Sequence, residues 1–250
     1  MYLIIFKTIA AVSIFLLTLI AGLLPMKIAK NKAHLLCLGD AFASGVFLSA
    51  ALLHLLPEAE NGFRVITNNT YPFAQFICII TFVVLLIMER GIFTLSKNHK
   101  VHNKIIAPLL LILLLTIHSL VEGAAIGTGN TFAETSMLFF AVIAHKGSES
   151  FALATNLHHH NLTTKNVQQI IAIFSFITPL GIFIASLVMY ALQTNSGNTI
   201  GAIFNAIAAG TFLYLATEHL LKGTKFLENF YAIVTLILGI ALMALVAIYI

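Results

Sequence analysis

Long apolar segments occupy almost the whole of this chain and limit what it can fold into. Of its 250 residues, 60% are hydrophobic and only 9% are charged, whereas a soluble domain has about 25% charged residues. A large core does not explain the difference, because the surface of a soluble protein still needs polar side chains. A helix that spans a bilayer needs about 20 mostly apolar residues. The composition therefore predicts an all-α polytopic membrane protein.

Eight segments have the length and the apolar character of membrane-spanning helices. Short polar links join them and leave no soluble domain, so we expect a bundle that forms one transmembrane domain over residues 1–250. The first segment lacks a clear cleavage motif and is expected to be a span rather than a signal peptide. Pro179 predicts a kink within the sixth. The segments lie approximately at residues 2–25, 35–57, 72–95, 105–129, 133–157, 166–191, 199–221 and 225–250.

Basic residues gather in alternate links, and this asymmetry predicts the orientation of the chain. Lysine and arginine are enriched in cytoplasmic loops. The links after odd-numbered segments, together with Arg90 near the end of the third segment, carry ten basic residues: Lys27, Lys30, Lys32, Arg90, Lys97, Lys100, Lys104, Lys165, Lys222 and Lys225. The opposite links hold one basic residue, Arg64, beside Glu58, Glu60 and Glu134. Both termini are therefore expected to be extracytoplasmic. The net charge of +4 follows from this bias and does not indicate nucleic-acid binding.

Two histidine–glutamate pairs lie midway along the fourth and fifth segments. His118 and Glu122 are four residues apart, as are His145 and Glu149, so each pair shares one helix face. Ionisable groups inside a bilayer are costly and indicate function by default. A short link makes the two segments antiparallel neighbours, and the pairs can then face each other at similar depth.

Two imidazoles and two carboxylates form a ligand set that suits Zn²⁺, Fe²⁺, Mn²⁺, Co²⁺ or Ni²⁺. Two ionised carboxylates also balance the charge of a divalent cation inside the membrane. The simpler interpretation is that each pair only makes hydrogen bonds between helices, and two pairs at matched depth disfavour it. Lys146 is adjacent to the second pair. Its ammonium could pair with Glu149 or Glu122, take the place of a second cation, or extend to the membrane interface.

The chain resembles the ZIP (Zrt/Irt-like) family of metal transporters over nearly its whole length. The family pattern His-Ser/Asn-x-x-Glu-Gly matches the fourth segment, and His-Lys before a further glutamate matches the fifth, as in a subfamily that includes animal plasma-membrane zinc importers. The other matching motifs are Gly45-Val-Phe-Leu48, His54-Leu-Leu-Pro57-Glu58, Thr178-Pro-Leu-Gly181, Ala209-Gly-Thr-Phe-Leu-Tyr214 and Glu218-His219.

The resemblance implies a fold of eight helices, with both termini outside and metal moved into the cytoplasm. It implies that His118, Glu122, His145 and Glu149 are the transport-site ligands. The transported substrate is expected to be Zn²⁺, with Fe²⁺, Mn²⁺, Co²⁺, Ni²⁺ or Cd²⁺ as alternatives. We also expect location in the cell (inner or plasma) membrane, contact with the lipid bilayer, and a homodimer as one oligomeric form. Some bacterial members hold a second metal at positions that here are Ser119, Lys146 and Thr178, which favours a site for one metal.

Further polar residues mark a path through the predicted bundle. Asp40 and His54 lie on the second segment, and Glu218 and His219 on the seventh. The predicted orientation places His54 and Glu58 near the outer mouth of the path. It places Asp40, Glu218 and His219 near the inner mouth. Each one alone is more typical of an interfacial polar residue than of a ligand. Five further histidines lie in predicted cytoplasmic loops: His99, His102, His158, His159 and His160. They either collect released metal or are simply solvated loop residues.

Two other classes of protein, a hydrolase and a metal sensor, could also use a buried histidine and glutamate set. An intramembrane metal-dependent hydrolase also uses histidine and glutamate ligands, with a position left open for water. The sequence, however, contains neither the His-Glu-x-x-His motif nor a Gly-x-Ser-x-Gly motif. A metal sensor would need an output domain that the eight segments leave no room for. The sequence therefore predicts a transporter and not an enzyme.

Overall fold

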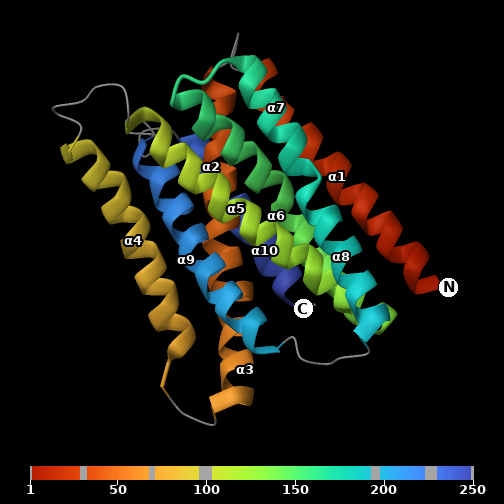
Figure 1. The fold of residues 1–250 in the computed structure, drawn as a ribbon. Helices are drawn as coiled ribbons and strands as arrows, with labels where there is room; N and C mark the ends of the chain where they lie inside the picture. Colours follow the sequence, from red (N-terminus) through yellow and green to blue (C-terminus); the bar gives the residue numbers. More distant parts are fainter. Residues whose placement is uncertain are drawn as a thin grey trace.

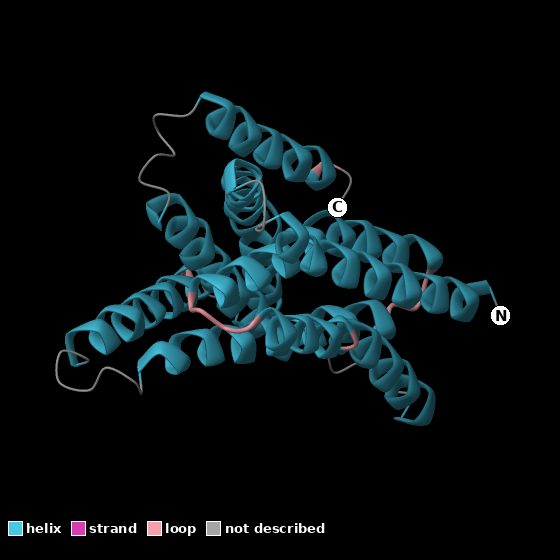
Figure 2. Ribbon diagram, turned by 90° about the horizontal axis from the view of Figure 1, so that it is seen from above, coloured by secondary structure: helices cyan, strands magenta, loops and turns pink. Residues whose placement is uncertain are grey.

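The computed structural model describes residues 2–28, 33–67, 71–95, 103–192, 198–222 and 230–248. Every regular element in these ranges is a helix (Figures 1 and 2). The helices are α1 (Tyr2–Ile28), α2 (Ala33–Ala50), the π-helix η1 (Ala51–Leu55), α3 (Leu56–Thr67), α4 (Phe73–Leu95), α5 (Asn103–Thr128), α6 (Phe132–His159), α7 (Thr164–Ser175), α8 (Ile177–Leu192), α9 (Asn198–Lys222) and α10 (Phe230–Ala247). The predicted all-α class is confirmed.

Each predicted segment corresponds to one helix or to consecutive helices. The second predicted segment is α2, η1 and α3 in succession, and it extends beyond residue 57 to Thr67. The sixth is α7 followed by α8, with a single turn residue between them. Both chain ends lie toward the same end of the bundle as the link between α5 and α6 (Figure 1).

Five helical stretches of the described chain are long and apolar enough to cross a membrane: Tyr2–Ile28, His34–Val65, Leu111–Thr128, Thr164–Val188 and Phe230–Ala247. A shorter apolar helix covers Phe73–Met88. This pattern is that of a polytopic membrane protein. Composition does not mark α6 as a span, because Lys146 and Glu149 lie near its middle. The number of eight spans therefore stays a prediction.

The sixth predicted segment is interrupted before its proline rather than at it. The turn lies at Phe176, whose backbone N–H donates to the Ile173 carbonyl at 3.1 Å. Pro179 lies in the first turn of α8. Proline has no N–H to donate to the preceding turn, and a first turn is the position where a helix tolerates it. The helix therefore ends and restarts one turn earlier than the predicted kink.

The helices pack as two groups. In the first helix group α5 packs against α8, α1 packs against α6, and α7 lies against α1. In the second helix group α2 packs against α10, and α9 packs against α2, α3 and α4. Fewer contacts join the groups, chiefly those of α6 with α2 and of α5 with α9. Figure 1 shows α4, α9 and α3 on one side of the bundle and α1, α7 and α8 on the other.

Glycines set the close approach of helices inside each group. A Cβ on Gly123 of α5 would collide with the Thr178 carbonyl of α8, and one on Gly181 of α8 would collide with the backbone of α5. In the second group, a Cβ on Gly239 of α10 would collide with the Phe42 carbonyl of α2. Small residues of this kind allow helix backbones to touch in lipid.

Replacing Gly239 with alanine should destabilise the protein. Its Cβ would meet backbone atoms that cannot rotate away, and overpacking of this kind costs about 1–3 kcal/mol. The measurement is the midpoint of thermal unfolding of the purified protein in detergent. Gly201→Ala is the matched control, because a Cβ at that position of α9 meets nothing within 4 Å. A midpoint for Gly239→Ala equal to that of the control would contradict the packing described for α2 and α10.

Candidate metal centre

The structure brings the two histidine–glutamate pairs together in the interior of the bundle. Ligand atoms of His118, Glu122, His145 and Glu149 all lie within 4.8 Å of one another, and all four residues are buried. No other group of three or more histidine, cysteine or acidic ligands is found in the part of the chain that the structure describes. We call these four residues the central cluster.

The link between α5 and α6 is what brings the two pairs to matching positions. It is short, and the two helices run in opposite directions on either side of it (Figure 1). The Thr131 side chain accepts the backbone N–H of Glu134 at 3.2 Å, and the Glu134 carboxylate accepts the backbone N–H of Asn130 at 3.0 Å. These two bonds cap the start of α6, and the register of α6 then fixes the depth of its pair.

Both imidazoles point at one oxygen of Glu122. His118 Nε2 lies 2.9 Å from Glu122 Oε1, and His145 Nε2 contacts the same oxygen. One buried ring nitrogen, His145 Nδ1, has no hydrogen-bond partner among the described residues, and the Nε2 atoms of both rings share a single carboxylate oxygen. Because buried polar atoms nearly always have a partner, this side of the cluster fits a metal ion that would satisfy the imidazoles.

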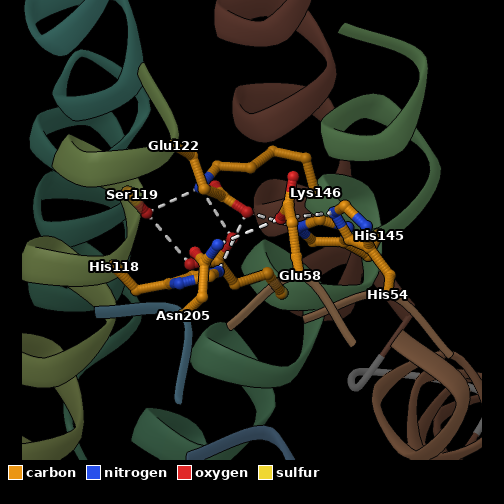
Figure 3. Close-up of polar contacts among 9 residues, drawn as sticks. His54, Glu58, His118, Ser119, Glu122, His145, Lys146 and Asn205 are labelled. Atoms are coloured by element: carbon orange, nitrogen blue, oxygen red, sulfur yellow. Dashed lines mark hydrogen bonds and ion pairs between the residues drawn. The ribbon is translucent and has the colours of Figure 1, made fainter. Parts of the chain in front are cut away.

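Lys146 lies on the opposite side of the carboxylates. Its Nζ donates to Ser119 Oγ at 2.6 Å, to Glu149 Oε2 at 2.6 Å and to Glu122 Oε2 at 3.0 Å (Figure 3). Ser119 in turn donates to Glu149 Oε1 at 2.9 Å. The Lys146 side chain is 0% exposed, and its Nζ lies 5.2 Å from the centre of the Phe174 ring. The lysine is thus hydrogen-bonded to the carboxylates of the central cluster and does not extend to a surface.

The charges of this region nearly cancel without a metal. Two carboxylates and one ammonium give a formal charge of −2 + 1 = −1 when the imidazoles are neutral. A divalent ion changes this value to +1, so either state leaves one formal charge. Buried charges are tolerated only when they are paired and hydrogen-bonded. The arrangement therefore accommodates the cluster with and without one divalent cation.

Phe212 of α9 covers the imidazoles from the second helix group. Its ring centre lies 4.7 Å from that of His118 and 5.4 Å from that of His145, both in edge-on geometry. Phe47 of α2 stacks behind it at 4.9 Å. Sequence reasoning did not select Phe212. The only signal for it was its position inside the Ala209–Tyr214 motif.

A second polar group lies beside the cluster. His54 belongs to the π-helix η1, a type of turn that occurs frequently at functional sites. It is buried, with its ring centre 6.5 Å from that of His145. Its Nε2 lies 3.9 Å from Glu58 Oε2, and Asn205 Nδ2 of α9 donates to that same oxygen at 3.0 Å (Figure 3). Asn205 was not predicted, because a single asparagine in an apolar helix carries no spacing signal.

The remaining predicted residues lie outside the central cluster. Thr178 is buried near Gly123, and its hydroxyl has no hydrogen-bond partner among the described residues. Glu218 accepts a hydrogen bond from Asn156 of α6, and Asp40 lies half-buried on α2. The histidines at the end of α6 are exposed at 158 and 159 and half-buried at 160. His99, His102 and the side chain of His219 lie outside the described residues.

The fold and the centre together define a class: a polytopic helical membrane protein with a buried nitrogen and oxygen ligand set in its core. The ligand types suit a divalent transition metal. The family description "ZIP Zinc transporter" matches residues 4–105 and 94–247, so the chain belongs to the ZIP zinc transporter family. The predicted resemblance is confirmed.

Known zinc transporters resemble this chain over most of its length. Zinc transporter ZIP1 of Takifugu rubripes is 28% identical over 299 aligned residues, which cover 97% of each chain. Zinc transporter ZIP1 of Danio rerio is 27% identical and covers 86% of this chain and 87% of its own. Zinc transporter 11 of Arabidopsis thaliana is 26% identical and covers 97% and 85%. The chain is therefore a membrane transporter of a metal-transporting family, and the prediction that it is not an enzyme agrees with these names.

Replacing Lys146 with methionine should strongly destabilise the metal-free protein. It leaves Glu122 and Glu149 buried without their cation, and removing one partner of a buried ion pair costs about 3–5 kcal/mol. Added Zn²⁺ should restore much of the loss, because the ion can take over the charge balance. The measurement is the thermal midpoint with and without Zn²⁺.

The control for this variant is Thr155→Ala, which removes a buried hydroxyl of α6 whose hydrogen bond stays within its own helix. The control should respond to Zn²⁺ as the unchanged protein does. If Zn²⁺ raises the midpoint of Lys146→Met no more than that of the control, Lys146 does not balance the carboxylates.

Proposed function

We propose that this chain imports a divalent transition metal, with Zn²⁺ as the main substrate, across the cell membrane into the cytoplasm. The observation that carries the proposal is the central cluster, a buried set of two imidazoles and two carboxylates in a member of a zinc transporter family. Metal ligands held inside an apolar bundle suit transient binding of an ion in transit. The ligand set also accepts Fe²⁺, Mn²⁺, Co²⁺, Ni²⁺ or Cd²⁺, and affinity order alone does not determine selectivity.

The proposed topology has eight spans that form one transmembrane domain over residues 1–250, with both termini extracytoplasmic. The distribution of basic residues supports this orientation. In it the end of the bundle that holds Glu58 and Asn205 faces outward, and the end of α6 that holds His158–His160 faces the cytoplasm. The membrane is the cell membrane, and a homodimer remains the predicted oligomer.

The transport path we propose runs from the outer mouth through the central cluster to the inner mouth. In this topology His54 and Glu58 lie on the outer side of the cluster, and the ring centre of His54 lies 6.5 Å from that of His145. Asp40, Glu218 and His219 lie toward the inner side. A helix rearrangement about a central site, as in other secondary carriers, then exposes the ion to the cytoplasm. The sequence contains no phosphate-binding loop, so a metal gradient or binding of the released metal in the cytoplasm would drive transport.

Removing either carboxylate of the central cluster should abolish uptake. In proteoliposomes loaded with a zinc-sensitive dye, Glu122→Ala and Glu149→Ala should each reduce initial uptake at least tenfold, since even partners outside the ligand shell contribute about 10–100-fold to metal sites. Glu134→Gln is the control, because it changes a glutamate of the same helix that lies at an exposed end. Competition by the other divalent metals in the same assay ranks the substrates.

Unchanged uptake in both alanine variants would refute the transport site. Metal-dependent turnover of a lipid or peptide without zinc flux would favour the hydrolase alternative instead. The two outcomes are separable in one preparation, because dye fluorescence and product release are independent readouts.

We propose further that the centre carries one metal ion, with the Lys146 ammonium in the place of a second. The contacts of Lys146 with both carboxylates and with Ser119 support this arrangement. Lys146→Asp replaces the ammonium by a carboxylate and should raise the stoichiometry from one Zn²⁺ to two per chain. Equilibrium dialysis followed by elemental analysis measures this number. A stoichiometry that stays at one would show that the lysine does not replace an ion.

A further inference from the structure

One hydrogen bond between buried side chains joins the two helix groups at a distance from the central cluster. Asn156 Nδ2 of α6 donates to Glu218 Oε1 of α9 at 2.9 Å. Asn156 is 4% exposed and Glu218 is 6% exposed. A carboxylate and an amide buried this deeply in a bundle are costly unless they are paired. Their pairing across the boundary between the groups therefore needs an explanation beyond packing.

Asn156 lies on the face of α6 that carries the metal ligands. At about 100° per residue, positions 145, 149 and 156 fall within about 40° of one another around the helix. Asn156 follows His145 by eleven residues, which is about 16 Å along the helix axis. An ion that leaves the cluster along this face toward the end of α6 therefore meets the pair of Asn156 and Glu218.

The end of α6 holds Asn156 firmly in place. The Asn156 carbonyl accepts both the backbone N–H of His160, at 3.1 Å, and the ring Nδ1 of His160, at 2.9 Å. Asn161 follows in a left-handed conformation, with φ of 62°, which is a common way for a helix to terminate. Because its backbone is held in place, the Asn156 side chain stays within reach of Glu218, and separation of α6 from α9 would break their hydrogen bond.

A similar pair at the other end of α9 differs from Asn156 and Glu218 in two ways: it lies within one helix group, and its carboxylate is partly exposed. Asn205 of α9 and Glu58 of α3 form a similar amide–carboxylate bond, but both belong to the second helix group. The Glu58 side chain is 39% exposed, whereas Glu218 is almost fully buried. A movement of one group against the other would therefore preserve the bond of Asn205 and break the bond of Asn156.

We propose that Asn156 and Glu218 form a latch that closes the path from the central cluster toward the cytoplasmic end of α6. This inference rests on the proposed transport function and assigns a gate to it. The latch opens when the first helix group moves relative to the second, and the Glu218 Oε1 atom that Asn156 releases then faces the departing cation. Both are positioning residues for release and do not belong to the central cluster.

The test measures access to the closed segment rather than transport. Ala152 is 0% exposed and lies one turn before Asn156 on the same helix, so a cysteine there reports opening. Ala152→Cys is made in a chain whose Cys37 and Cys78 are replaced by serine and alanine. A membrane-impermeant maleimide is added to inside-out vesicles. Asn156→Ala should speed labelling about tenfold, since a hydrogen bond to a charged group contributes on that order.

Two controls separate a latch from general loosening. Thr217→Ala removes the hydroxyl next to Glu218, whose hydrogen bond stays within α9, and should leave the labelling rate unchanged. Ala206→Cys reports the opposite end of α9, where the position is buried against α3 and α4. Its labelling in right-side-out vesicles should not respond to Asn156→Ala. Faster labelling at both cysteines would overturn the proposal in favour of a structural role.

Glu218 provides a second approach to the same bond if the Asn156 variant does not accumulate. Glu218→Ala should speed labelling of Ala152→Cys as Asn156→Ala does, and the double variant should add nothing further. Glu218→Gln keeps an acceptor oxygen and should label more slowly than Glu218→Ala. Labelling that is unchanged by either single alanine variant, or additive in the double variant, would disprove the latch.

The outcome for the latch is independent of the outcome for the transport function. Labelling needs no metal, so it can rise as expected even if the protein moves no zinc. Conversely, zinc uptake that depends on Glu122 and Glu149, together with unchanged labelling, would leave the transport function intact and remove the latch.

Discussion

The ion pairs of Lys146 with Glu122 and Glu149 are the interaction on which the structure of the centre depends. Carboxylates inside an apolar bundle need a positive partner, because the low dielectric gives them no solvation. The lysine supplies it from the same helix as one of the carboxylates. The carboxylate oxygens are therefore held in position by the lysine, and the imidazoles are directed at the other oxygen of Glu122.

The placement of the cluster follows from the division of the helices into two groups. All four residues of the central cluster come from α5 and α6, which belong to the first group, whereas Phe212 and His54 approach from the second. The glycines in α5, α8, α2 and α10 hold helices together inside each group, while fewer contacts cross between the groups. Relative movement of the groups would thus change what covers the ligands without changing the ligands themselves.

The sequence predicted the helices and the two histidine–glutamate pairs that meet in the interior, because both depend on short-range periodicity. A four-residue spacing places His118 with Glu122 on one face regardless of what packs around them. The partners Asn205, Asn156 and Phe212 could not be predicted in this way, because they reach their sites from helices distant in sequence. The break at Phe176 differs from the predicted kink at Pro179 for a local reason: the chain accommodates the proline in the first turn of a new helix and does not bend at it.

The π-helix η1 changes which helical face the segment from α2 to α3 presents to its neighbours. A π turn contains one residue more than an α turn, and one extra residue rotates everything after it by about 100°. The side chains of α3 are therefore out of phase with those of α2, so α9 meets one helical face of α2 and another of α3, while α10 packs against α2. A single continuous segment thus changes its packing surface along its length, and His54 lies in the turn where the phase changes.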